Sequence, residues 1–161
     1  MTEPISIRYA QEADAALVLE FICSLARFEK LENLVEVNLK TIRDELFDPA
    51  SPARCLLAFS GEAPVGFALF FFTFSTFLGR PGIYLEDLFV VPEARSRGVG
   101  KRLLQTLAKI ALDRNCGRLE WAVLDWNDRA IQFYEALGAR PQDAWTVYRL
   151  EGSALMDLAG D

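Results

Sequence analysis

Histidine is missing from this chain of 161 residues. Without an imidazole, the sequence excludes Ser-His-Asp and Cys-His triads, histidine-based metal sites and histidine acid–base catalysis. An enzyme built from this chain must therefore work with carboxylates, phenols, thiols, lysine or backbone dipoles. Cysteine is scarce as well: the three residues Cys23, Cys55 and Cys116 form no C-x-x-C pair. That pattern is more typical of a reducing compartment than of a disulfide framework.

Basic runs and long apolar runs are also lacking. The 17 Lys and Arg against 23 Asp and Glu give a net charge of −6, and an acidic chain without clustered cations is a poor nucleic-acid binder. The longest apolar run, around residues 65–72, is too short for a membrane-spanning helix. Residues 1–4 are not a basic region followed by an apolar stretch, so we expect no secretory signal. We therefore expect a cytoplasmic protein with no nucleic-acid partner, no membrane partner and no metal site.

The sequence does contain a regular alternation of strand-like and helix-like segments. Hydrophobic residues make up 52% and charged residues 25% of the chain, a globular balance. Patterns rich in β-forming residues predict strands at residues 5–9, 54–59, 64–74, 83–91, 118–126 and 145–150. Helical spacing predicts helices at residues 14–28, 37–47, 98–111 and 130–137, with a loop at 75–82. This order predicts one mixed α/β domain over residues 1–161.

The junction at residues 90–101 joins a predicted strand to a predicted helix and holds two glycines and three cations. The first amides of a helix lack internal partners and lie at the positive end of its dipole, so they bind phosphate readily. Gly98 and Gly100 let the backbone approach a ligand closely. The added positive charge comes from Arg95, Arg97 and Lys101. A basic turn whose glycines serve geometry alone is the alternative interpretation.

The spacing Arg95-x-x-Gly98-x-Gly100 is neither a G-x-G-x-x-G fingerprint nor a P-loop. It matches the pyrophosphate-binding motif of the GNAT superfamily of N-acetyltransferases, which bind acetyl coenzyme A. Residues 84–90 (YLEDLFV) and 124–139 resemble the diamine acetyltransferase family, which includes spermidine/spermine N-acetyltransferase. Residues 28–31 (FEKL), 75–76 (ST) and 123–130 (VLDWNDRA) look more like the thialysine N-ε-acetyltransferase branch. The resemblance covers nearly the whole chain.

This resemblance implies a GNAT fold, an α/β architecture in which a mixed, strongly bent sheet is flanked by helices. Acetyl coenzyme A would lie where two neighbouring parallel strands splay apart. The implied reaction is direct acetyl transfer to a primary amine of a small diamine or lysine-like substrate, without an acyl-enzyme, in a homodimer. The coenzyme-binding positions are then Leu88, Phe89, Val90, Arg95, Ser96, Arg97, Gly98, Val99, Gly100, Lys101, Asn127, Arg129, Ala130 and Tyr134.

Proton transfer identifies the candidate catalytic residues. A primary ammonium has a pKa near 10.4, so removing its proton at pH 7 costs about 4.6 kcal/mol. The resemblance implies that Glu86 accepts this proton through water and that Tyr134 protonates the leaving thiolate. A phenol of pKa about 10 does so at a cost of about 2 kcal/mol. Because adjacent strand residues face opposite sides of a sheet, Asp87 is expected to be structural. The alternatives are a structural carboxylate for Glu86 and a packing aromatic for Tyr134.

The substrate-binding positions that the resemblance implies are Phe28, Glu29, Glu86, Trp126 and Asp143. A merely solvated acidic face formed by Glu29, Glu32 and Glu36 remains an alternative. The polyamine branch carries an acid at the position of Ser75, and its loss here favours a shorter or zwitterionic amine.

Two further residues keep two interpretations each. Arg129 binds either a substrate carboxylate or a coenzyme phosphate. Asn127 caps its helix, holds the pantetheine arm, or does both. Three other functions also stay open at this point: a polyamine acetyltransferase, an acetyltransferase of protein amines, and a non-catalytic acyl-coenzyme sensor. Because Glu86 and Tyr134 are both present, catalysis is favoured over the sensor.

Overall fold

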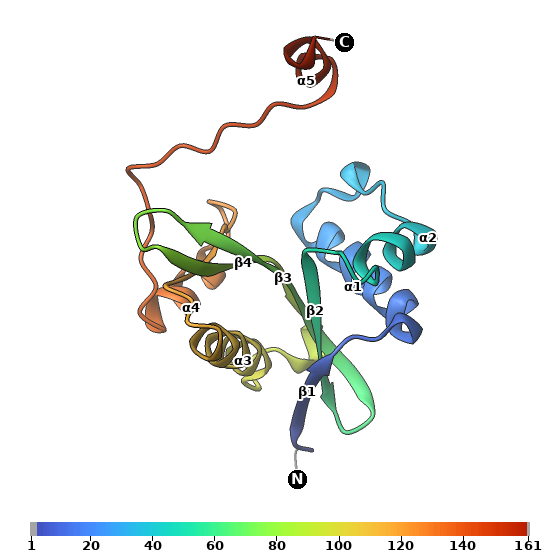
Figure 1. Cartoon of the computed structure of the whole chain (residues 1–161). Helices are drawn as coiled ribbons and strands as arrows, with labels where there is room; N and C mark the ends of the chain where they lie inside the picture. The colour runs from blue at the N-terminus through green and yellow to red at the C-terminus, as the bar shows by residue number, and fades with distance from the viewer. Residues whose placement is uncertain (1–2, 161) are drawn as a thin grey trace. The chain divides into compact units, whose positions relative to one another are not determined.

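The computed structural model describes residues 3–160 and contains two compact units, Met1–Ala122 and Val123–Asp161. The first unit holds a five-stranded sheet in the order β1-β2-β3-β4-β5 (Figure 1). Its strands are β1 (Ile5–Tyr9), β2 (Ala53–Ser60), β3 (Ala63–Ser75), β4 (Arg80–Val90) and β5 (Leu119–Trp121). Strands β1 to β4 are antiparallel to their neighbours, whereas β5 is parallel to β4. The predicted mixed sheet is confirmed.

Helices flank this sheet, with α1 and α2 on one side and α3 on the other (Figure 1). Helix α1 spans Ala15–Glu29, α2 spans Leu39–Thr41 and runs into the π-helical turn η3 (Ile42–Leu46), and α3 spans Val99–Asp113. Short 3-10 turns are η1 (Glu12–Asp14), η2 (Glu32–Leu34) and η4 (Pro92–Ala94). Within residues 3–160, no helix has both the length and the apolar character needed to cross a membrane.

The helical spacing of apolar residues explains how the layers pack. Helix α1 buries Val18 and Phe21 against the sheet, where the Phe21 and Phe67 rings stack with centroids 5.5 Å apart. On α3, Leu103 and Leu107 are fully buried. Burying a side chain of this size contributes about 1.5–3 kcal/mol, so both helices are held to the sheet mainly by their apolar faces.

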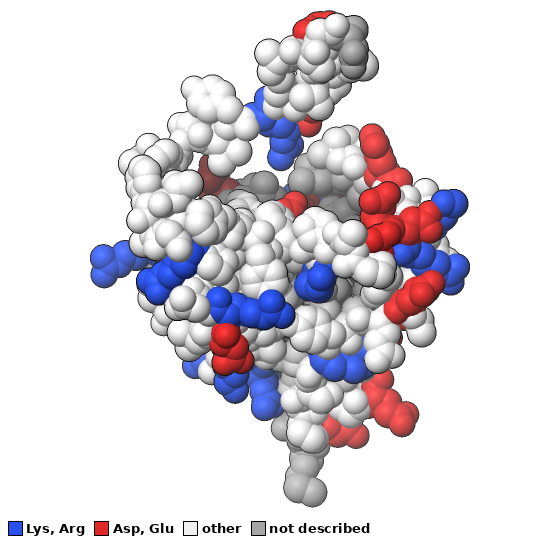
Figure 2. Space-filling view, viewed as in Figure 1, with Lys and Arg blue, Asp and Glu red and all other residues white. Residues whose placement is uncertain are grey.

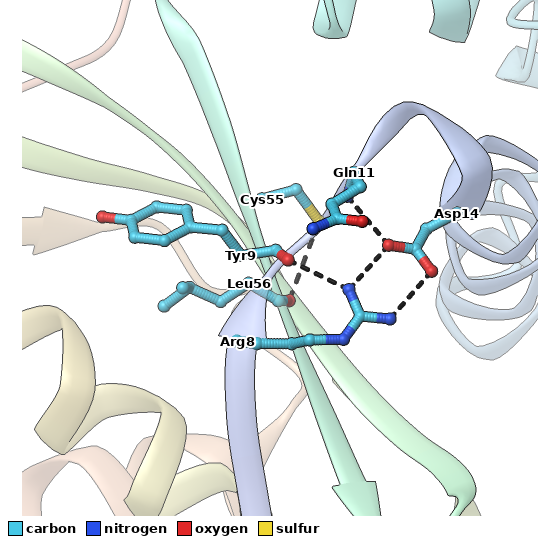
Figure 3. Close-up of polar contacts among 6 residues, drawn as sticks. All are labelled: Arg8, Tyr9, Gln11, Asp14, Cys55 and Leu56. Carbon is cyan, nitrogen blue, oxygen red and sulfur yellow. Dashed lines mark hydrogen bonds and ion pairs between the residues drawn. The ribbon is translucent and has the colours of Figure 1, made fainter.

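Polar contacts at the start of α1 tie that helix to β1 (Figure 3). The Arg8 guanidinium donates to both carboxylate oxygens of Asp14, at 2.7 and 2.9 Å. The backbone N–H of Gln11 donates to the same carboxylate at 2.8 Å. The hydrogen bond from Arg8 is the main reason that the pKa of Asp14 lies below its usual value. The first turn of α1 is therefore anchored next to the edge of the sheet.

The second unit differs from the sequence prediction at its end. It holds α4 (Asp128–Ala136) and α5 (Gly152–Ala159). The predicted helix at residues 130–137 corresponds to α4, but α5 has no counterpart among the predicted elements. The predicted strand at residues 145–150 is wrong, because these residues form neither helix nor strand. Alternating apolar side chains are not sufficient for a strand, since its backbone groups need a partner strand to pair with.

Three predicted elements of the first unit also have different bounds in the structure. The predicted strand at 118–126 is reduced to β5, because its pairing with β4 ends at Trp121. The predicted helix at 37–47 is divided into α2 and η3. The predicted loop at 75–82 is instead a tight hairpin, in which Ser75 pairs with Arg80.

Candidate active site

The edge of β4 is open beyond the end of β5. Strand β5 pairs with β4 only from Ile83 to Leu85, whereas β4 continues to Val90. The Val91 amide donates to the Val65 carbonyl of the β3 side at 3.0 Å. Because backbone groups alternate in direction along a strand, those of Leu88 and Val90 point to the opposite edge, where the Val90 carbonyl already accepts a hydrogen bond from Arg95. An extended ligand can add to such an edge as a further strand does.

A β-bulge lies in β4 beside this edge. Leu69 of β3 pairs with Asp87, and the next residue, Phe70, pairs with Leu85, so Glu86 has no partner across the sheet. A bulge interrupts the alternation of side chains between the two faces. The strict alternation that assigned Glu86 and Asp87 to different faces therefore does not hold here.

Asp87 lies on the sheet face that α1 covers. It belongs to one row with Cys55 and Leu69 across β2, β3 and β4, and residues directly opposite each other share a face. Cys55 is part of the core beneath α1, and Leu69 packs against that core. The Asp87 carboxyl is thus half-buried on the side of the sheet where α1 ends at Glu29.

Two neighbouring carboxylates, Glu86 and Glu29, act on the carboxyl group of Asp87. Burial, and then the charges of Glu86 and Glu29, raise the pKa of Asp87 to about 6. Burial also raises the pKa of Glu29, whereas Glu86 is exposed. Asp87 therefore exchanges its proton nearer to neutral pH than an ordinary carboxyl group. The alternation of strand residues predicts neither the bulge nor the burial that distinguish Asp87 from Glu86.

The thiol in the same cross-strand row as Asp87 is not a nucleophile. Cys55 is buried, and burial is the main cause that raises its pKa to about 12. A thiol with that pKa is protonated at neutral pH and does not attack a thioester. This agrees with acetyl transfer without an acyl-enzyme.

The predicted anion site forms the turn from β4 into α3. After η4, Ser96 and Gly98 both adopt left-handed backbone conformations, with φ of 62° and 81°. The first intrahelical bond runs from the Arg102 amide to the Gly98 carbonyl at 3.0 Å. The amides of residues 99–101 precede this bond and are the first donors of α3, and the start of a helix attracts anions.

The cations of the motif point in different directions. Arg97 is exposed and donates from Nη2 to the Ser60 hydroxyl at 3.1 Å, and Lys101 is exposed on the first turn of α3. The Arg95 side chain is half-buried, and its Nε donates to the Val90 carbonyl at 3.0 Å. In Figure 2, acidic side chains gather on the side of α1 and α2, so these cations add positive charge to a largely acidic protein.

The remaining predicted residues belong to the second unit. The Asn127 side chain accepts a hydrogen bond from the Ala130 amide at 3.2 Å, which confirms that Asn127 caps α4. On α4, the half-buried ring of Tyr134 lies 5.4 Å from that of Phe133. Three further positions are exposed: Trp126, Arg129 and Asp143. Their roles, and that of Tyr134, stay predictions.

Comparison with known proteins identifies the family. The model of the acetyltransferase (GNAT) family matches residues 19–139. The chain belongs to this family. Thialysine N-epsilon-acetyltransferase from Bos taurus is 40% identical over 167 residues, which cover 97% of this chain and 98% of that protein. These two matches confirm the predicted GNAT fold and the resemblance of this acetyltransferase to the thialysine branch.

Two other proteins are similar to this acetyltransferase. L-ornithine N5-acetyltransferase from Arabidopsis thaliana is 47% identical over 93 residues, which cover 58% of this chain and 41% of that protein. Among solved structures, an integron cassette protein from the mobile metagenome of V. cholerae has a TM-score of 0.83 at 28% identity and matches over 98% of both chains.

The acyl donor of this family is acetyl coenzyme A, and the first unit fits such a ligand. The coenzyme is long and polyanionic, and the structure offers both an open strand edge at β4 and helix amides with exposed cations at the start of α3. Within residues 3–160, no group of three or more His, Cys, Asp or Glu side chains is arranged to hold a metal ion.

Proposed function

We propose that this acetyltransferase transfers the acetyl group of acetyl coenzyme A directly to a primary amine of a small diamine or lysine-like substrate. The observation that carries the proposal is the succession, along β4 and into α3, of the Glu86–Asp87 carboxylates, the open strand edge and the anion-binding turn. This order would place a cationic amine at one end of the coenzyme arm and its diphosphate at the other.

Glu86 is the proposed proton acceptor. It would take a proton from the substrate ammonium through water, so that the amine nitrogen can attack the thioester carbonyl carbon. Asp87 supports this role, because a half-buried carboxyl with a pKa near 6 keeps negative charge beside the ammonium at neutral pH. When the carbon–sulfur bond breaks, the leaving thiolate would take the phenolic proton of Tyr134. The second proton that the attacking nitrogen loses on becoming an amide would restore the phenol.

Backbone groups are the main proposed contacts for the coenzyme. The edge of β4 at Leu88 and Val90 would hold the pantetheine arm, with Asn127 and Ala130 as further contacts. The backbone groups of the expected residue Phe89 face β3 instead. The diphosphate would lie on the backbone of residues 95–101, where Ser96, Val99 and Gly100 supply amides. Charge for the phosphates would come from Arg97, Lys101 and Arg129.

The relatives support a lysine-like acceptor. Both named enzymes, the thialysine and the L-ornithine acetyltransferases, act according to their names on amino acids with a side-chain amine. Phe28, Glu29, Trp126 and Asp143 are the proposed contacts for the rest of the substrate, and Arg129 is a candidate for its carboxylate. The acid that the polyamine branch carries at the position of Ser75 would contact a second cationic group, so its loss favours a shorter or zwitterionic amine.

We further infer that the two compact units form one acetyltransferase domain in a cytoplasmic homodimer. The family match supports one domain, since it runs from residue 19 to residue 139 and includes the boundary at Ala122. Exposed apolar side chains support an interface: Trp145, Val147 and Tyr148 are 77%, 89% and 92% exposed. Free cysteines support a reducing compartment. The acidic net charge favours small-molecule partners over nucleic acid.

A thiol-release assay with parallel acceptors tests the proposal. Thialysine, ornithine, lysine, short diamines, spermidine and a lysine-containing peptide are compared at saturating acetyl coenzyme A. We expect the amino acids to give the highest kcat/KM. A preference for spermidine would assign the protein to the polyamine branch, and a preference for the peptide would indicate a protein acetyltransferase. Tight coenzyme binding by calorimetry without release on any acceptor would indicate a sensor.

A further inference from the structure

Arg95 opens the R-x-x-G-x-G motif, but its side chain is directed toward the end of α1. Its guanidinium carbon lies 4.7 Å from the ring centroid of Phe28 and 5.7 Å from that of Phe89. Its Nε donates to the Val90 carbonyl at 3.0 Å. These contacts hold the guanidinium between the last turn of α1 and the end of β4, so Arg95 has a role that the motif alone does not explain.

Phe28 and Phe89 differ in how firmly they are held. Phe89 is buried, and its ring lies 6.2 Å from that of Phe21, which stacks on Phe67. Phe28 is 39% exposed and lies one residue before the end of α1. Arg95 therefore connects an exposed aromatic side chain at the amine side to the rigid aromatic core.

The backbone on the other side of Arg95 is equally constrained. Ser96 and Gly98 hold left-handed conformations with φ of 62° and 81°, and α3 begins at the next residue, Val99. Left-handed backbone is unfavourable for a residue like serine, so this conformation persists only where the surrounding structure holds it. A ligand that orders the first amides of α3 thereby also fixes the position from which the Arg95 side chain extends.

We propose that Arg95 is a positioning residue that couples the anion-binding turn to Phe28, so that a bound coenzyme stabilises the amine side of the site. The inference rests on the proposed function for the identity of the two ligands. Coupling of this kind is reciprocal: if the coenzyme tightens amine binding, the amine tightens coenzyme binding by the same factor. Substitution of Arg95 should then weaken amine binding to the coenzyme complex more than it weakens coenzyme binding in the absence of amine.

The competing role is a direct phosphate ligand, and three variants separate the two roles. Arg95→Met keeps an unbranched stem but removes the charge and the Nε donor, while Arg95→Lys keeps the charge and loses the planar group. Arg114→Met is the matched control, because the Arg114 guanidinium lies 5.4 Å from the Phe72 ring in the same kind of contact, after the end of α3. Arg114 has no proposed role in binding or catalysis.

Two measurements on the whole protein test the coupling. The first is amide hydrogen exchange at residues 26–31 with and without coenzyme A. We expect coenzyme A to slow this exchange in the wild type and in Arg114→Met, but not in Arg95→Met. The second is a comparison of the calorimetric Kd for coenzyme A with the amine KM at saturating acetyl coenzyme A. Arg95→Met should raise the amine KM about three- to tenfold, the range expected for a cation–π contact, and change the coenzyme Kd less than about twofold. Arg95→Lys should lie between Arg95→Met and the wild type.

Each opposite result has its own meaning. A large rise in the coenzyme Kd of Arg95→Met at an unchanged amine KM would make Arg95 a phosphate ligand and overturn the coupling. Binding of coenzyme A to the wild type without slower exchange at residues 26–31 would overturn the coupling but leave the proposed function intact. If coenzyme A does not bind to the wild type, the proposed function fails, and the coupling fails with it.

Discussion

Glu86 and Asp87 are neighbours on β4, yet only Asp87 has a pairing partner on β3, because a bulge inserts Glu86 between the paired positions. The two carboxyl groups consequently differ in environment. Glu86 is exposed, whereas Asp87 is half-buried on the face covered by α1 and has a pKa raised to about 6. This difference separates the expected effects of substituting each residue.

Glu86→Gln removes the proposed proton acceptor but keeps the size and polarity of the side chain. The substrate ammonium must then lose its proton to bulk solvent, so we expect the pH profile of kcat/KM to shift toward higher pH. Steady-state rates between about pH 6 and 10, which includes the ordinary ammonium pKa, measure the shift. A profile that superimposes on that of the wild type would argue against Glu86 as the acceptor.

Asp87→Asn tests the raised pKa through protein stability. The pKa of Asp87 rises from 3.8 to about 6 on folding, so between these pH values the folded protein binds more protons than the unfolded chain. The contribution of Asp87 to the stability of the folded protein therefore falls by about 2–3 kcal/mol as the pH rises through this window. Above the window this contribution stays constant. An uncharged asparagine is not subject to this loss.

Urea unfolding of both proteins at pH 4.5 and pH 8 measures the difference. We expect Asp87→Asn to gain stability relative to the wild type at pH 8 but much less at pH 4.5. Equal differences at the two pH values would contradict a raised pKa, because the effect would then come from packing alone.

Tyr134→Phe removes only the phenolic hydroxyl from α4. If Tyr134 protonates the leaving thiolate, kcat should fall about 100-fold or more, which is the usual contribution of a general acid. The calorimetric Kd for coenzyme A should stay within about twofold, since the ring remains. An unchanged kcat would remove Tyr134 from the acid role and favour a packing role beside Phe133.

Gly98→Ala tests the turn at the start of α3. Gly98 has φ of +81°, and no atom lies within 4 Å of the position that a Cβ would occupy. The substitution therefore adds left-handed backbone strain of about 1 kcal/mol without a steric clash. Because Gly98 directly precedes the residues that carry the first amides of α3, we expect weaker coenzyme A binding by calorimetry as well.

Gly79→Ala is the matched control for this substitution. Gly79 has φ of +64°, its Cβ position is equally open, and it lies in the hairpin between β3 and β4. It should lose similar stability but bind coenzyme A as the wild type does. Equal loss of coenzyme affinity in both variants would show that general destabilisation, rather than the turn, weakens binding.

The candidate site was predictable where short segments carry the signal. The motif from Arg95 to Gly100 indicates an anion site, because the unpaired amides and the dipole belong to the first turn of one helix. The cap by Asn127 is equally local, since acceptor and donor lie three residues apart. Arg95 shows the limit of such signals: the motif locates the residue, but contact with Phe28 brings together parts of the chain far apart in sequence.

The sequence by itself determined the order of the main helices and strands, the glycine-containing turn from β4 into α3 and the family resemblance. Each of these depends on side-chain spacing within a helix or strand, or on the conformation of a few consecutive residues. Only the tertiary structure decided that β4 bulges at Glu86, that β5 ends at Trp121 and that residues 145–150 form no strand. These features depend on which backbone groups find a partner on another strand, and that pairing is settled by the packing of the whole unit rather than by any one segment.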